Sequence, residues 1–400
     1  MNGLAVFLLV TLGSGDPWQD APAATREAEA HALREAKNRQ LKPPDPGRVE
    51  RFLFKLEDDL LVERWLNPPR GFHLRLGGIG EGSGFGVGPG YRYSTGAFDF
   101  RVSAAASLRR YAIGEASLLL PGAVRDGPFF ELYARHRDFP QEDFFGLGPD
   151  SLADERTDFA LRDTLVRATA GARRGGFSAG VAGGYLDPSI GEGTDKRMPS
   201  TGSVFAFRGV PGLEQQPTFT LIEPYVEFST ADPPLNPVRG VSLRSSLSRY
   251  SDRDLDSYSF QRVDLDARAY LPLFQRTHTI ALRTWIAESR PESGHEVPFY
   301  LQPTLGGSYS LRGFRTYRFR DRSLALMQAE YRWRINEFVT GALFYDTGAV
   351  SRRLDDLGKL ERDYGFGLRA GGRNGVAFRA DVAFGSGEGT RILLRFNNVF

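Results

Sequence analysis

Apolar and polar side chains alternate along much of this chain, and the segment 260–271 shows the alternation most clearly. Successive side chains of a β-strand point to opposite faces, so a period of two predicts a strand with two different faces. Here one face is apolar and the other is charged. The apolar set is Val263, Leu265, Ala267, Ala269 and Leu271, and the charged set is Arg262, Asp264, Asp266 and Arg268.

The same division recurs elsewhere. In the segment 327–335 the two sets are Ala329, Tyr331, Trp333 and Ile335 against Gln328, Glu330, Arg332 and Arg334. Residues 376–400 predict two further strands, joined by the glycine-rich turn 385–389. A packed apolar core cannot hold so many charged side chains, whereas a water-filled lumen can. The pattern therefore predicts an all-β fold, a transmembrane antiparallel β-barrel whose apolar face meets lipid.

The length of the alternating region, 71–400, sets the size of this barrel. Strand patterns and turn-forming clusters follow one another there, with no helical pattern longer than two turns. At roughly 20 residues for a strand and its connection, the region holds about 16 strands. Pro121-Gly122 and Pro233-Pro234 predict short periplasmic turns. Long outer loops are expected at 140–158, 186–202, 250–259, 288–321 and 351–363.

The first 70 residues lack this alternation. The apolar run Leu4–Val10 is too short for a membrane helix but suits a signal-peptide core, and Ala21-Pro22-Ala23 suits cleavage. We therefore predict a signal peptide at 1–23. Residues 24–70 are predicted as a short periplasmic helical segment and linker.

Glycine occupies every second position from Gly78 to Gly90. The pattern predicts a strand with one face free of side chains, which another backbone can approach closely. Two interpretations stay open: a weak early strand that opens against the last strand or makes room for a loop, or a curved strand where the barrel bends. The glycines are Gly78, Gly80, Gly82, Gly84, Gly86, Gly88 and Gly90.

Composition mainly excludes other classes. The 51 basic and 49 acidic side chains nearly balance and form no basic block, so no nucleic acid is expected. There is no cysteine, and the five histidines lack ligand spacing, so neither a metal nor a cofactor is expected. Gly176-x-Ser178-x-Gly180 matches a hydrolase nucleophile motif, but that motif needs a strand–turn–helix setting, so no enzyme is expected.

One loop carries a recognisable motif. The segment Gly306–Phe314 resembles the Val/Leu-Arg-Gly-Phe/Tyr loop signature of the BamA/TamA superfamily of outer-membrane assembly and secretion barrels, the bacterial surface antigen family. Other segments resemble that family in the same order along 71–400. They are Phe144–Ser151, Phe344–Val350, Gly365–Arg369 with Arg379–Ala383, and a C-terminal insertion signal of Gly389, Ile392, Leu394, Phe396 and Phe400.

The resemblance implies that this loop folds into the lumen. Arg312 would pair with Asp346 and also with Glu330, which the alternation independently places on the inner face. Gly313 would allow a sharp turn, and Phe314 would anchor the tip by packing. The chain departs from the family in one respect, because residues 24–70 are too few for a periplasmic POTRA module of roughly 60 residues.

The family implies a place in the bacterial outer membrane and a role in inserting or translocating polypeptides or lipids there. Outer-membrane lipid, polypeptide substrates and periplasmic proteins are the expected partners. Glycines 78–90 and residues 392–400 would form a weak seam between the first and last strands. The alternative is a passive channel for small solutes, and a third hypothesis is a hydrolase that acts through Ser178.

Overall fold

A computed structural model describes residues 70–122, 126–234, 236–274, 277–336, 338–372 and 375–395. The predicted signal peptide, nearly all of the segment 24–70, and Phe396 and Phe400 lie outside the described residues.

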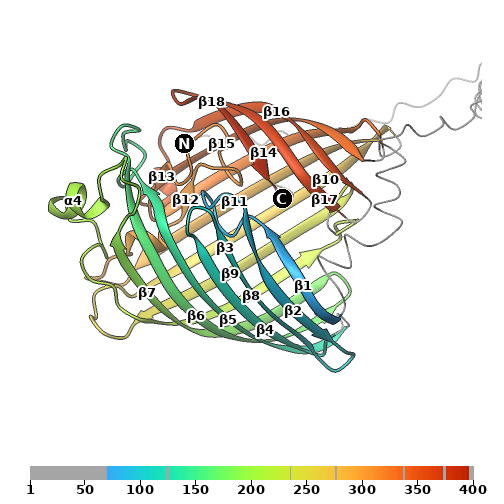
Figure 1. Cartoon of the computed structure of the whole chain (residues 1–400), viewed down its shortest axis with the longest axis horizontal. Coiled ribbons are helices and arrows are strands. Elements are labelled where there is room, and N and C mark those ends of the chain that lie inside the picture. The colour runs from blue at the N-terminus through green and yellow to red at the C-terminus, as the bar shows by residue number, and fades with distance from the viewer. Residues whose placement is uncertain are drawn as a thin grey trace, which may run out of the picture. The chain divides into compact units, whose positions relative to one another are not determined.

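Sixteen strands form one antiparallel sheet in chain order, which curls into a nearly closed barrel (Figure 1). This confirms the predicted fold class. The strands are β1 Arg70–Gly77, β2 Gly86–Ser94, β3 Asp99–Ser107, β4 Ala112–Leu120, β5 Gly127–Phe144, β6 Thr157–Arg174, β7 Phe177–Glu192, β8 Phe219–Ser229, β9 Gly240–Asp252, β10 Phe260–Leu273, β11 His278–Pro291, β14 Ser323–Arg334, β15 Val339–Ser351, β16 Glu361–Gly372, β17 Gly375–Gly385 and β18 Gly389–Arg395.

Few other elements occur in the described residues. A second, two-stranded sheet pairs β12 (Thr304–Leu305) with β13 (Phe319–Arg320). The helices are α4 (Thr201–Phe205) and the 3-10 turns η1 (Ala206–Arg208), η3 (Phe299–Leu301) and η4 (Leu354–Asp356). In this part of the chain, no helix has the length and apolar character needed to cross a membrane.

The two faces of the strands follow the predicted alternation. On β10, Val263 and Leu271 are about half exposed on the outer face. Asp266, from the other set, faces inward and pairs with Arg268 and Arg283. The outer wall is apolar because it meets lipid, and the inner wall is charged because its side chains pair with one another or meet water.

The two ends of the barrel differ. At one end, called the turn end here, the connections are short, and they include Pro121-Gly122 and Pro233-Pro234, as predicted. At the other end, called the loop end, lie the long connections 145–156, 193–218 and 292–322. The predicted loops 140–158 and 186–202 are too wide, because β5, β6 and β7 continue into them. Burial of Phe144 and Phe159 explains this extension, since both pack on Phe299.

The prediction that residues 78–90 form one strand is wrong. Strand β1 ends at Gly77 and β2 begins at Gly86, so residues 78–85 form the first hairpin loop, at the loop end. Gly82 and Gly84 have φ angles of +76° and +72°, which are left-handed values that strands do not use. Gly88 does lie within β2, where a Cβ would overlap the backbone of Ala104.

The sheet begins at β1 and finishes at β18. Within the described residues, β1 is hydrogen-bonded only to β2, and β18 only to β17. The two strands are nevertheless neighbours, because the Arg395 guanidinium on β18 lies 2.6 Å from the Glu81 carboxylate in the first hairpin loop. The seam, meaning the junction of β1 and β18, therefore has no strand ladder in this part of the chain.

Candidate functional site

The candidate site is built around the connection between β11 and β14, whose residues 306–318 we call the lumen loop. Strands β12 and β13 pair at its base. Leu311 and Phe314 are buried against Leu324 and Leu326 on the inner face of β14. Farther along the inner face of β14, toward the turn end, the residues are Gln328, Glu330 and Arg332 instead of leucines. The lumen loop thus packs on an apolar part of the wall and reaches a charged part.

Arg312 extends from the lumen loop into this charged part and is fully buried. Its Nε and Nη2 donate to the two oxygens of Asp346 at 2.7 and 2.8 Å, and its Nη1 donates to Glu330 at 2.7 Å. The guanidinium carbon lies 3.5 Å from the centre of the Phe344 ring. A planar guanidinium suits this position because it can bind one carboxylate with two parallel bonds and still reach a second.

Further charges surround this group. Glu330 also accepts from Arg332 at 2.8 Å and from Arg369 at 2.9 Å. Asp381 pairs with Arg369 and lies 2.9 Å from Nε of Arg379. Each of these carboxylates is almost completely shielded from solvent. Removing one partner from such a buried network leaves an uncompensated charge, which costs about 3–5 kcal/mol.

Wall side chains also bind the backbone of the lumen loop. Three consecutive carbonyls, those of residues 308–310, each accept a hydrogen bond from the wall. The donors are Arg379 to Ser308 at 2.8 Å, Arg283 to Tyr309 at 3.0 Å and Gln328 to Ser310 at 2.8 Å. These contacts could not be predicted from the sequence, because alternation shows which way a wall residue points but not which group it contacts.

Gly313 lies in a turn, as predicted, in which the Phe314 N–H donates to the Leu311 carbonyl at 3.1 Å, and it also has a second role. The backbone turns sharply at Gly306 and Gly307, whose φ angles are +107° and +96°. At Gly313, a Cβ would lie only 2.6 Å from the backbone of Gly385 and from Cβ of Asp363. Glycine is needed there because the lumen loop approaches β17 closely. Phe314 is buried, as expected, with its ring centre 5.2 Å from that of Phe319.

Sequence and structure comparisons agree with this arrangement. Residues 213–392, which include the lumen loop and its partners on β14, β15 and β16, match the family model described as the Omp85 superfamily domain. The match covers 180 of the 400 residues. It confirms the predicted resemblance to the BamA/TamA superfamily of outer-membrane barrels.

Two solved structures resemble this barrel. BamA from Haemophilus ducreyi, lacking POTRA domains 1-3, aligns with a TM-score of 0.60 at 15% identity over 82% of this chain and 69% of that chain. CdiB from Escherichia coli aligns with a TM-score of 0.55 at 12% identity over 82% of this chain and 62% of that chain. At these identities the likeness concerns the fold. Comparison with curated proteins gives no match.

Among the residues predicted for the seam, Gly78 lies beside the last strand, because a Cβ there would come within 3.6 Å of the Arg395 guanidinium on β18. Phe396 and Phe400 lie outside the described residues. Gly78, Gly80, Gly82 and Gly84 lie in the first hairpin loop, whereas Gly86 and Gly88 belong to β2, one strand away from the seam. Gly389 begins β18, and Ile392 and Leu394 are mostly exposed on its outer face. Glu81, which lies among these glycines, forms an ion pair with Arg395 of β18.

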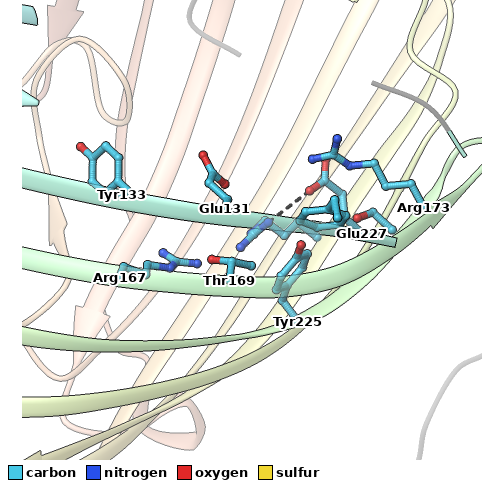
Figure 2. Close-up of a pocket in the computed structure, with 10 residues that line it drawn as sticks. Glu131, Tyr133, Arg167, Thr169, Arg173, Tyr225 and Glu227 are labelled. Atoms are coloured by element: carbon cyan, nitrogen blue, oxygen red, sulfur yellow. Dashed lines mark hydrogen bonds and ion pairs between the residues drawn. The ribbon is translucent and has the colours of Figure 1, made fainter. Parts of the chain in front are cut away.

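The turn end of the barrel contains a cavity of about 480 Å³, here called the lumen cavity (Figure 2). Its wall comes from β5 to β9 and is mostly polar. Figure 2 shows side chains from several strands directed toward one another, with Glu227 bound to Arg244 at 3.1 Å. Ser178 lies in this wall within β7, not at a strand–turn–helix junction. The lining residues are Phe129, Glu131, Tyr133, Arg167, Thr169, Arg173, Ser178, Tyr225, Glu227 and Arg244.

Proposed function

We propose that this barrel inserts or translocates polypeptides at the outer membrane, with the seam between β1 and β18 as the place where substrate meets lipid. The observation that carries the proposal is the sheet order, in which the first and last strands have no ladder between them in the described residues. Lipid transfer by the same route is the related possibility that the family resemblance leaves open.

An unpaired strand edge is costly in lipid. Hydrocarbon offers no hydrogen bonds, so each unsatisfied backbone group costs several kcal/mol and barrels normally close completely. An exposed edge also offers its N–H and C=O groups to any extended chain that can pair with it. The described part of β18, Gly389–Arg395, offers such an edge on the side facing β1.

The contents of the lumen favour this proposal over a passive channel. A solute channel needs a continuous water path, yet the loop end contains the lumen loop and several buried aromatic clusters. One cluster joins Phe144 and Phe159 of the wall to Phe205 and Phe299 of the outer loops. The lumen cavity lies instead near the turn end, and in this proposal that end faces the periplasm and receives the polypeptide.

The passive channel remains the alternative, since the lumen cavity is lined by polar and charged side chains. Planar-bilayer recordings of the purified protein and of Arg312→Ala distinguish the two functions. The proposal expects a small basal current that rises when Arg312 is replaced. A large, constantly open pore that is indifferent to this substitution would favour the channel.

Site-specific crosslinking tests the proposal directly. A photo-crosslinking amino acid is placed at Leu74 or Leu76 of β1, which are 42% and 44% exposed on the outer face. Matched controls are Leu243 and Leu247 of β9, which are 42% and 46% exposed on the opposite wall. We expect pulse-labelled, newly exported polypeptides to crosslink at β1 and not at β9. Equal yields at the two strands, or none at β1, would contradict the function.

A further inference from the structure

Glu81 lies in the first hairpin loop, and its carboxylate reaches two other parts of the barrel. One oxygen accepts from the Ser308 hydroxyl at 2.8 Å and from the Arg395 guanidinium at 2.6 Å. The other accepts from the Ser308 N–H at 3.3 Å and from the Thr316 hydroxyl at 3.4 Å. Ser308 and Thr316 belong to the lumen loop, whereas Arg395 belongs to the last strand. A single side chain thus joins the first hairpin, the lumen loop and β18.

The lumen loop is shaped to receive this carboxylate. At Gly307, a Cβ would overlap a carboxylate oxygen of Glu81, so any other residue there would displace it. The positive φ of Gly307 also requires glycine. The Glu81 and Arg395 side chains are only 14% and 16% exposed, so water competes weakly for their ion pair.

The lumen loop is bound to the other side of the seam as well. Glu388, in the hairpin between β17 and β18, accepts from Arg318 at 2.5 Å and from the Arg315 N–H at 2.9 Å. The Arg395 guanidinium also lies 4.6 Å from the centre of the Tyr309 ring. The loop therefore has several contacts with the last hairpin. Glu81 of the first hairpin loop hydrogen-bonds both the lumen loop and β18.

We propose that Glu81 is a positioning residue that holds the seam closed at the loop end and couples its opening to the lumen loop. When its contacts with Arg395 and the lumen loop break, the first hairpin separates from β18, because no strand ladder holds these edges together in the described residues. Displacement of the lumen loop by substrate would break these contacts and widen the seam. This inference rests on the proposed function, in which the seam is the route for substrate.

Distance measurements test the inference in the full chain. The chain has no cysteine, so Leu74→Cys on β1 and Ile392→Cys on β18 give two unique spin labels on exposed positions. Pulsed electron paramagnetic resonance in lipid nanodiscs then reports the width of the seam. We expect Glu81→Gln and Arg395→Gln each to raise the population of long distances about tenfold, as expected for loss of one charge-assisted pair.

Two comparisons make the test specific. The double variant, Glu81→Gln with Arg395→Gln, should widen the seam no more than Glu81→Gln, because both changes remove the same pair. Glu115→Gln is the matched control, since that carboxylate also pairs with an arginine, Arg75 of β1, but does not contact the lumen loop or β18. Unchanged distances in both single variants, or equal widening in the control, would overturn the inference.

The outcome is separable from that of the proposed function, because the distance measurement needs no substrate. Widening of the seam without selective crosslinking at β1 would retain the role of Glu81 and reject the function. Selective crosslinking at β1 with unchanged seam distances would retain the proposed function and reject the role of Glu81. If Glu81→Gln fails to fold, Arg395→Gln and the exchanged pair, Glu81→Arg with Arg395→Glu, carry the test. The exchanged pair should restore the short distance.

Discussion

At the scale of single residues, the position of the lumen loop depends on charged side chains that are buried and paired with one another. Arg312 binds Asp346 and Glu330 without any exposure to solvent. By contrast, Arg353 and Asp355 form an ion pair in an outer connection, where their side chains are 68% and 67% exposed. An exposed pair contributes 0–1 kcal/mol, roughly, because water solvates both charges almost as well. An arginine–carboxylate pair therefore matters more for stability in the buried lumen than in the exposed outer connection.

Replacing Arg312 by methionine should lower the free energy of unfolding by about 3–5 kcal/mol, since Asp346 would remain buried without its counter-charge. Urea unfolding of the protein in lipid vesicles, followed by tryptophan fluorescence, measures this change. Arg353→Met is the control and should alter stability by less than about 0.5 kcal/mol. Equal stability of the two variants would mean that Arg312 is not needed to neutralise the network.

At the scale of elements, alternation describes each strand because every second side chain meets lipid. Two adjacent residues of β9, Ser246 and Leu247, face opposite sides of the barrel wall. Leu247 is 46% exposed on the outer face. Ser246 lies opposite Asp264 of β10, and directly opposed residues share a face, so Ser246 points into the lumen.

Arginine should therefore have opposite effects at these adjacent positions. Leu247→Arg places a charge in hydrocarbon and should cost about 2–4 kcal/mol near the middle of the bilayer. Ser246→Arg adds the same charge at the same depth but beside Asp264, so stability should change little. The same urea titration compares the two variants. A similar loss in both would contradict the assignment of the two faces.

In the first hairpin, the local sequence pattern predicts the wrong element. A glycine at every second position satisfies the period of a strand, but it also suits a hairpin with left-handed turns. Gly82 and Gly84 adopt such turns, so the chain reverses within the pattern. The spacing of the glycines can be seen in the sequence. The positive φ angles of Gly82 and Gly84 depend on where the chain reverses, which the spacing does not show.

At the scale of the whole molecule, the two ends of the barrel differ in what the described residues place inside them. The lumen loop joins apolar packing at the loop end to the charged network below it, and the lumen cavity lies nearer the turn end. The loop end should therefore obstruct the flow of ions.

Deleting most of the lumen loop should remove this obstruction. We expect a variant in which residues 308–316 are replaced by a short glycine-serine linker to conduct ions more strongly than the intact barrel in planar bilayers. Deletion of residues 354–358 from the exposed connection between β15 and β16 serves as the control and should leave the current unchanged. A current that stays small after the lumen loop is removed would show that other segments close the barrel.

The candidate site was only partly predictable for the same reason. The motif and the alternation together placed Arg312, Asp346 and Glu330 in the lumen, where the structure brings them together. Arg369 and Asp381 also alternate inward, but no pattern showed that they would join the same network. The wall contacts to the carbonyls of residues 308–310 had no sequence signal, because any backbone segment could accept them.

The sequence by itself determined the class of this protein and the two faces of strands such as β10 and β14. It could do so because alternate residues of a strand face lipid and the water-filled lumen, so the environment of each residue is visible as a local pattern of apolar and polar side chains. Only the tertiary structure decided what meets across the seam. Glu81 and Arg395 are separated by 314 positions in the chain and become neighbours when the barrel curls round on itself. Such a contact depends on the closure of the whole sheet, which no local pattern contains.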